Sequence, residues 1–148
     1  DGYDPSDMVQ LLKSLSVGQA RDELQQLLVE AKVDMTPFYL ESLYNDNPKI
    51  ICSGLNELGK IGTENALLAI SKMLTHQLGE IRLTAMVALN GRYTSSARIP
   101  LLKGLHDPDE SMRIKALQIL ANSGEKLVGT SLLTSMALGA GASPPYSK

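Results

Sequence analysis

The sequence is poor in the residues on which several kinds of protein depend. It has no tryptophan, one phenylalanine and one cysteine among 148 residues. One cysteine excludes an intrachain disulfide framework and a cysteine-rich zinc site. Because aromatic side chains are scarce, the core must come from aliphatic residues, which is typical of packed helices rather than of β-sandwiches.

An excess of charge of one sign and long apolar runs are also missing. The 14 Lys and Arg stand against 16 Asp and Glu, and a chain without a basic excess is poorly suited to hold nucleic acid. No run of about 18 apolar residues occurs, so we expect no transmembrane helix and no membrane partner. The chain begins at Asp1 without methionine, which we interpret as a processed or excised N-terminus. The lone cysteine fits a reducing compartment, and we expect a cytoplasmic protein.

A repeat of 31 residues runs along most of the chain. Shifting the sequence by this distance superposes apolar residues in several columns. One column holds Leu12, Leu43, Leu74, Leu105 and Met136, and another holds Val9, Leu40, Ser71, Leu102 and Leu133. A third column holds Leu24, Leu55, Met86 and Leu117. A fourth column holds Leu27, Leu58, Leu89 and Leu120. A further column of Glu23, Gly54, Ala85 and Ala116 offers small residues where helices would approach closely.

Each copy contains two helical patterns separated by a short turn. The helix pairs span about 5–33, 36–63, 65–94 and 97–124, a single helix follows near 126–138, and residues 139–148 form a flexible tail. The pattern therefore predicts an all-α fold, an α-solenoid over 5–138 in which each pair buries its apolar faces against its neighbours. The deepest burial is expected at Leu43, Leu58, Leu74, Leu89, Leu105 and Leu120.

The copy over 97–124 also carries a charged pattern, with Asp107, Arg113, Ala116 and Leu120 spaced by six, three and four residues. This pattern resembles HEAT repeats, in particular the short HEAT-like form of bacterial and phycobilisome-lyase-type proteins, within the armadillo-like group. The resemblance implies a right-handed α-α superhelix whose second helices line a concave face. The other copies match this pattern less fully. At the positions of the charged pair, the copy over 65–94 has His76 and Arg82, the copy over 36–63 has Asn45 and Ile51, and the copy over 5–33 has Ser14 and Ala20.

The charged residues of this pattern are interpreted as structural. A carboxylate in a turn can cap the following helix and pair with an arginine of the same or the adjacent copy. We therefore expect Arg82, Asp107 and Arg113 to form a polar ladder that sets the stacking of the copies. Within the ladder, Asp107 should contact either Arg113 or Arg82.

The outward stripe of each second helix is the candidate partner-binding surface. Helical spacing assigns to it Lys49, Ser53, Asn56 and Lys60, then Glu80, Thr84, Val87 and Gly91, then Ser111, Lys115, Gln118 and Asn122. The first copy contributes Asp22, Gln25 and Val29. Arg92 and Tyr93, in the loop after the third copy, are added because these residue types are favoured at interface hot spots. The mixed, polar character of the stripe favours recognition of a protein over an anion track.

Chemistry-bearing residues form no convincing site. His76 and His106 lie near equivalent turns, but a metal site needs more ligands of fitting geometry. Cys52 is interpreted as a packing residue, because a catalytic thiolate needs a nearby histidine and an electropositive setting. We therefore assign no catalytic residue, no metal and no cofactor.

Three functions remain as hypotheses. The first is a non-catalytic scaffold or adaptor module that binds another protein on the concave face, as a small protein or as a domain of a larger one. The second is an enzyme or enzyme subunit similar to a bilin lyase, because that group shares the repeat. The third is a nucleic-acid binder, which the charge and the missing aromatic residues disfavour. Apolar ends would also allow end-to-end self-association.

Overall fold

The computed structural model describes residues 4–123, and every regular element within them is a helix. The α-helices are Pro5–Ser14 (α1), Gln19–Glu30 (α2), Thr36–Ser42 (α3), Pro48–Ile61 (α4), Glu64–Lys72 (α5), Gly79–Leu89 (α6), Arg98–Gly104 (α7) and Glu110–Asn122 (α8). Short 3-10 turns lie at Met73–Thr75 (η1) and Ser95–Ala97 (η2). The all-α prediction is confirmed for this part of the chain. The predicted helix 126–138 and the tail 139–148 lie outside the described residues.

Side-chain caps fix where several helices begin. Asp4 accepts a hydrogen bond from the Ser6 amide at the start of α1, and Asp109 accepts one from the Ser111 amide at the start of α8. Asn47 caps α4 in the same way, immediately before a proline at the first helical position. These caps satisfy amides that have no partner within the helix, so the turns between helices are set by local sequence.

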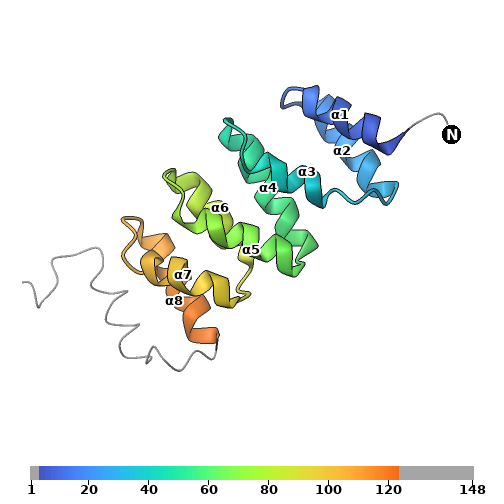
Figure 1. The fold of residues 1–148 in the computed structure, drawn as a ribbon. Helices are drawn as coiled ribbons and strands as arrows, with labels where there is room; N and C mark the ends of the chain where they lie inside the picture. Colours follow the sequence, from blue (N-terminus) through green and yellow to red (C-terminus); the bar gives the residue numbers. More distant parts are fainter. Residues whose placement is uncertain (1–3, 124–148) are drawn as a thin grey trace, which may run out of the picture.

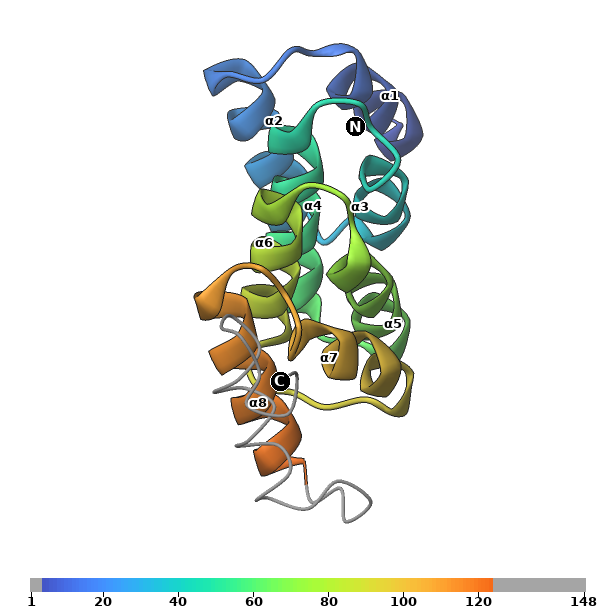
Figure 2. The same cartoon turned by 90° about the vertical axis from the view of Figure 1, so that its left-hand side faces the viewer.

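The helices are arranged in two rows. Figure 2 shows α2, α4, α6 and α8 on one side and α1, α3, α5 and α7 on the other, while Figure 1 shows successive helix pairs following one another along the molecule. The closest packing joins α4 to α6, and the first pair packs less closely on the rest than the later pairs do. The second helices therefore share one long side of the molecule.

The core lies between the two rows. The six leucines expected to be most buried are all in it, with exposed fractions between 0% and 8%. Small residues lie where helices meet closely: a Cβ built on Gly54 would be 3.2 Å from the carbonyl oxygen of Tyr39, and Ala85 and Ala116 are fully buried. Close approach of α3 to α4 therefore depends on the missing side chain at residue 54.

The first copy departs from the predicted columns in its second helix. Leu28 is 5% exposed and belongs to the core, whereas Leu27, which the 31-residue offset places in one column with Leu58, Leu89 and Leu120, is 60% exposed. One additional residue in the turn between α1 and α2 explains the difference: Arg21 follows Leu12 by 9 positions, whereas Arg113 follows Leu105 by 8. A shift of one residue rotates a helical face by about 100°.

Candidate functional site

The second-helix face is defined as the stripe of Lys49, Ser53, Asn56, Lys60, Glu80, Thr84, Val87, Ser111, Lys115, Gln118 and Asn122 on α4, α6 and α8. All of these residues are exposed except Thr84 and Lys115, which are half-buried. Figure 2 shows the three helices one after another on the same side of the molecule. The stripe predicted from helical spacing therefore lies at the surface of α4, α6 and α8, in three consecutive copies.

Two hollows interrupt this face. The larger, of about 690 Å³, lies between α4 and α6 and is lined by residues that include Asn56, Lys60 and Arg92. The second, of about 390 Å³, lies between α6 and α8 and is lined by residues that include Lys115 and Gln118. The two hollows share Val87 and Asn90 in their linings. They are therefore adjacent depressions that meet on α6.

Val87 is the large apolar side chain of the face. It is 54% exposed, and polar members of the face on α4 and α8 lie on either side of it. An exposed aliphatic group bordered by polar groups is a common composition for the centre of a protein-binding surface. Thr84, one turn earlier, donates its hydroxyl to the carbonyl of Glu80 at 2.8 Å and so turns its donor inward.

The lysines of the face differ in their partners. Lys60 Nζ lies 3.1 Å from the Glu57 carboxylate, an exposed pair that contributes little to stability. Lys49 and Lys115 take part in no ion pair among residues 4–123. These two ammonium groups, on α4 and α8, are therefore not held by a carboxylate of the described residues and can pair with carboxylates of a partner.

Arg92 is engaged within the protein itself. Its Nη2 donates to the Gly59 carbonyl at 2.6 Å and to the Ala88 carbonyl at 3.2 Å, while Nε donates to the Leu89 carbonyl at 3.0 Å. The guanidinium thus joins the ends of α4 and α6, where carbonyl groups lack helical partners. Arg92 therefore has a structural role, and part of its side chain also lines the larger hollow. Tyr93 is half-buried and packs against the core.

The turn before each later second helix contains the same hydrogen bond. A side-chain acceptor at positions 45, 76 and 107 accepts from the backbone amide two residues later. The bonds run from Asn47 N to Asn45 Oδ1 at 2.8 Å, from Leu78 N to His76 Nδ1 at 3.0 Å, and from Asp109 N to Asp107 Oδ1 at 2.9 Å. Asparagine, histidine and aspartate therefore accept the same turn hydrogen bond at positions spaced by 31 residues.

The arginines of the ladder brace these turns. Arg82 Nη1 donates to the carbonyls of His76 and Gln77, both at 2.9 Å, and Arg113 Nη1 donates to the Asp107 carbonyl at 2.8 Å. Of the two arginines, Arg82 is the one whose side chain contacts the carboxylate, with Nε 2.9 Å from Asp107 Oδ2. The ladder contact therefore runs from one helix pair to the turn of the next.

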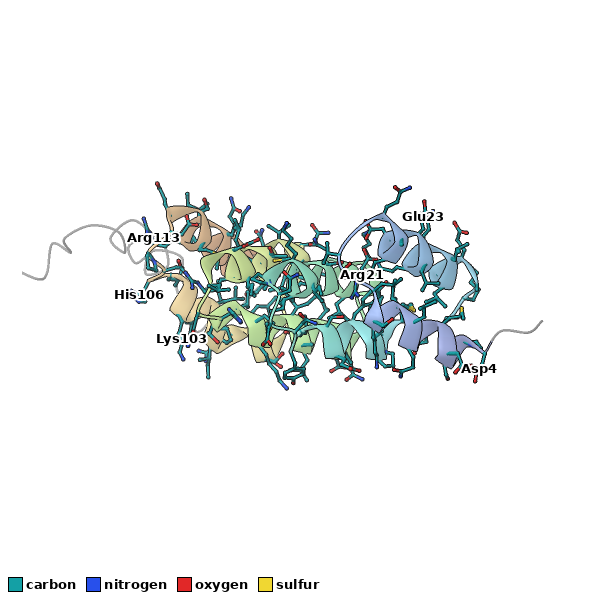
Figure 3. All side chains as sticks on the ribbon, turned by 90° about the horizontal axis from the view of Figure 1, so that it is seen from above. Asp4, Arg21, Glu23, Lys103, His106 and Arg113 are labelled. Atoms are coloured by element: carbon teal, nitrogen blue, oxygen red, sulfur yellow. The ribbon has the colours of Figure 1, made fainter. Side chains whose placement is uncertain are left out.

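Arg21 is a ladder residue that the sequence analysis missed. Its Nη1 donates to the Leu15 carbonyl at 2.9 Å, six residues earlier, as Arg82 and Arg113 do in their own turns. Its guanidinium carbon also lies 5.5 Å from the ring centroid of Phe38, within cation–π range. Figure 3 shows Arg21 between the two rows, where the first pair meets the second. A strict 31-residue offset points to Ala20 instead, because the first turn contains an additional residue.

The same shift changes the first copy's contribution to the face. Gln25, assigned to the stripe by the strict offset, is half-buried, whereas Glu23 is exposed and points away from the molecule (Figure 3). Gln19 donates to Glu23 at 2.9 Å and Gln26 donates to Glu30 at 3.2 Å, so these four residues follow one helical side. With the shifted register, the first copy presents Gln19 and Glu30 where the second copy presents Lys49 and Lys60.

The histidines and the cysteine occupy structural or peripheral positions. Nδ1 of His76 is already a hydrogen-bond acceptor, His106 lies on an exposed turn (Figure 3), and Cys52 is half-buried at the edge of the larger hollow. Among residues 4–123, no group of three or more His, Cys, Asp and Glu side chains is placed to hold a metal ion.

Comparison with known proteins adds no family to this description. No protein-family model matches the chain, and no curated protein sequence matches it. Within residues 4–123, no helix combines the length and the apolar character that crossing a bilayer requires.

Proposed function

We propose that this chain is a HEAT-like α-solenoid that acts as a non-catalytic scaffold and binds another protein across its second-helix face. The repeat is supported by the three turn acceptors 31 residues apart and by the alternation of first and second helices between two rows (Figure 2). A cytoplasmic location stays a prediction from the sequence. Since fold alone does not define function, the proposal depends on the properties of the face.

The observation that carries the proposal is the position of Val87. It is exposed on α6 at the junction of two hollows, between polar and positively charged groups of α4 and α8. A partner segment crossing the face could bury this side chain and place carboxylates near Lys49 and Lys115. Apolar burial would then supply affinity, and the charges would supply orientation and specificity.

The proposal is tested by selecting binders from a displayed peptide library on the full chain. Each binder is then measured against a variant with alanine at Asn56, Lys60, Lys115 and Gln118. The matched control replaces exposed residues of the same types on the first helices, namely Gln10, Asn65, Lys72 and Lys103. We expect the face variant to weaken binding by about tenfold or more and the control to leave it unchanged. Binders that retain full affinity for the face variant would refute the proposal.

A further inference from the structure

A third hollow lies where the first helix pair meets the second. It has a volume of about 330 Å³, and none of its lining residues belongs to the second-helix face. Its charged lining residues are Lys13, Arg21 and Glu41. Lys13 Nζ lies 2.8 Å from the Glu41 carboxylate, so these two charges offset each other. The positive charge of Arg21 therefore determines the net charge of the hollow.

Arg21 has one unused hydrogen-bonding edge in this hollow. The residue is only 9% exposed, and its Nη1 donates to the carbonyls of Leu12 and Leu15, both at 2.9 Å. Among residues 4–123, its Nε and Nη2 donate to no acceptor. The guanidinium lies over the ring of Phe38, an arrangement that leaves these in-plane N–H groups available. A shielded cation with unused donors is unfavourable unless an anion completes its hydrogen bonds.

The equivalent arginine of the third copy shows what occupies this position. Arg82 donates from Nε to Asp107 Oδ2 at 2.9 Å and from Nη2 to Asp107 Oδ1 at 3.5 Å. Asp107 belongs to the turn of the following copy, and the same position in the turn that follows Arg21 is Asn45. Asn45 lines the hollow, and its Oδ1 accepts from the Asn47 amide, so its Nδ2 is left as a donor. Donors of Arg21 and Asn45 therefore line the place where the later copy holds a carboxylate.

We propose that this hollow binds a carboxylate ligand, whose oxygens take the place that the Asp107 carboxylate has beside Arg82. A planar carboxylate matches the paired N–H groups of a guanidinium edge. Phe38 and the half-buried Ile50 supply apolar surface for the carbon atoms of the ligand. A single net positive charge favours a monoanion over a phosphate dianion. The site shares no residue with the second-helix face, so each of the two proposals can fail without the other.

The test titrates sodium acetate into the full chain at constant ionic strength and follows the Arg21 Nε–H and Asn45 side-chain amide signals by NMR. We expect saturable shifts with acetate and none with chloride. A blocked peptide with one glutamate is titrated in parallel. Binding of the peptide that is tighter by about tenfold or more would assign the site to a side chain of a partner protein, and equal affinities would assign it to a free small carboxylate. No saturable shift with either probe, or tighter binding of inorganic phosphate than of acetate, would overturn the proposal.

Asn45→Asp supplies the missing carboxylate from the chain itself. The variant keeps the turn hydrogen bond, as Asp107 does, and its carboxylate competes with the ligand at a high effective concentration. We expect acetate binding to weaken by about tenfold or more and the urea midpoint to rise. The matched control, Asn47→Asp, adds the same charge outside the lining of the hollow and keeps the cap of α4, as Asp109 caps α8. It should change the dissociation constant by less than about threefold, and an unchanged dissociation constant for Asn45→Asp would overturn the proposal.

Discussion

Arg82 and Asp107 connect two consecutive helix pairs through a bond of 2.9 Å between Nε and Oδ2. The pair is mostly shielded from water, with side-chain exposures of 19% and 7%. Asp107 also accepts from the Asp109 amide, so one carboxylate holds its own turn and the preceding copy. Breaking a shielded charged pair costs more than the pair itself contributes, because the remaining charge stays without a partner.

Asp107→Ala should therefore lower the free energy of unfolding by about 2–4 kcal/mol. Asp107→Asn should cost less, because an amide oxygen can keep the turn bond, as Asn45 does 62 positions earlier. Urea denaturation measures both variants. Equal losses for the two substitutions would show that the turn bond contributes nothing.

Leu28→Ala should cost about 2–5 kcal/mol, whereas Leu27→Ala should change stability by less than about 0.5 kcal/mol. The two residues are chemically identical neighbours, and only their exposure differs. Thermal unfolding of the two variants therefore tests the rotated register of α2 directly. If Leu27→Ala lowered the free energy of unfolding more than Leu28→Ala, α2 would follow the strict 31-residue register and the shifted register would be wrong.

The contrast between these leucines shows what the sequence could reveal. Leu58 and Leu89 were predicted to be buried because periodicity is a local property, and the structure confirms both. The first copy was misread because one additional turn residue shifts every later position, and a fixed offset cannot detect it. The engagement of Arg92 was not predictable either, because its acceptor Gly59 lies 33 residues away and comes close only through packing of α4 on α6.

Gly59→Ala should destabilise the protein by about 1–3 kcal/mol despite the better helix propensity of alanine. The added Cβ would lie 2.7 Å from the carbonyl oxygen of Ala88, so α4 and α6 would have to separate. Ser53→Ala, on an exposed position of the same helix, is the control and should leave the urea midpoint unchanged or slightly higher. An increase in stability for Gly59→Ala would mean that the two helices can move apart freely.

Tyr39→Phe should leave stability at neutral pH unchanged or slightly higher, because the buried Tyr39 hydroxyl has no hydrogen-bond partner among residues 4–123. Burial, with a smaller effect of the Glu57 charge, raises the pKa of Tyr39 from 10.0 to about 12. The unfolded chain therefore loses this proton first as the pH rises above 10, and the folded state loses stability up to about pH 12. Tyr39→Phe should reduce that alkaline loss in unfolding experiments between these pH values. An identical alkaline profile would contradict the assignment.

The most direct test of the central claim is the dissociation constant of a selected binder with a Val87→Asp variant. The control is Leu68→Asp, which places the same charge at an exposed aliphatic position of α5, 39% exposed, on the row of first helices. If the second-helix face binds the partner, Val87→Asp should raise Kd by about tenfold or more, and Leu68→Asp should leave it unchanged. An unchanged Kd for a correctly folded Val87→Asp variant would contradict the account.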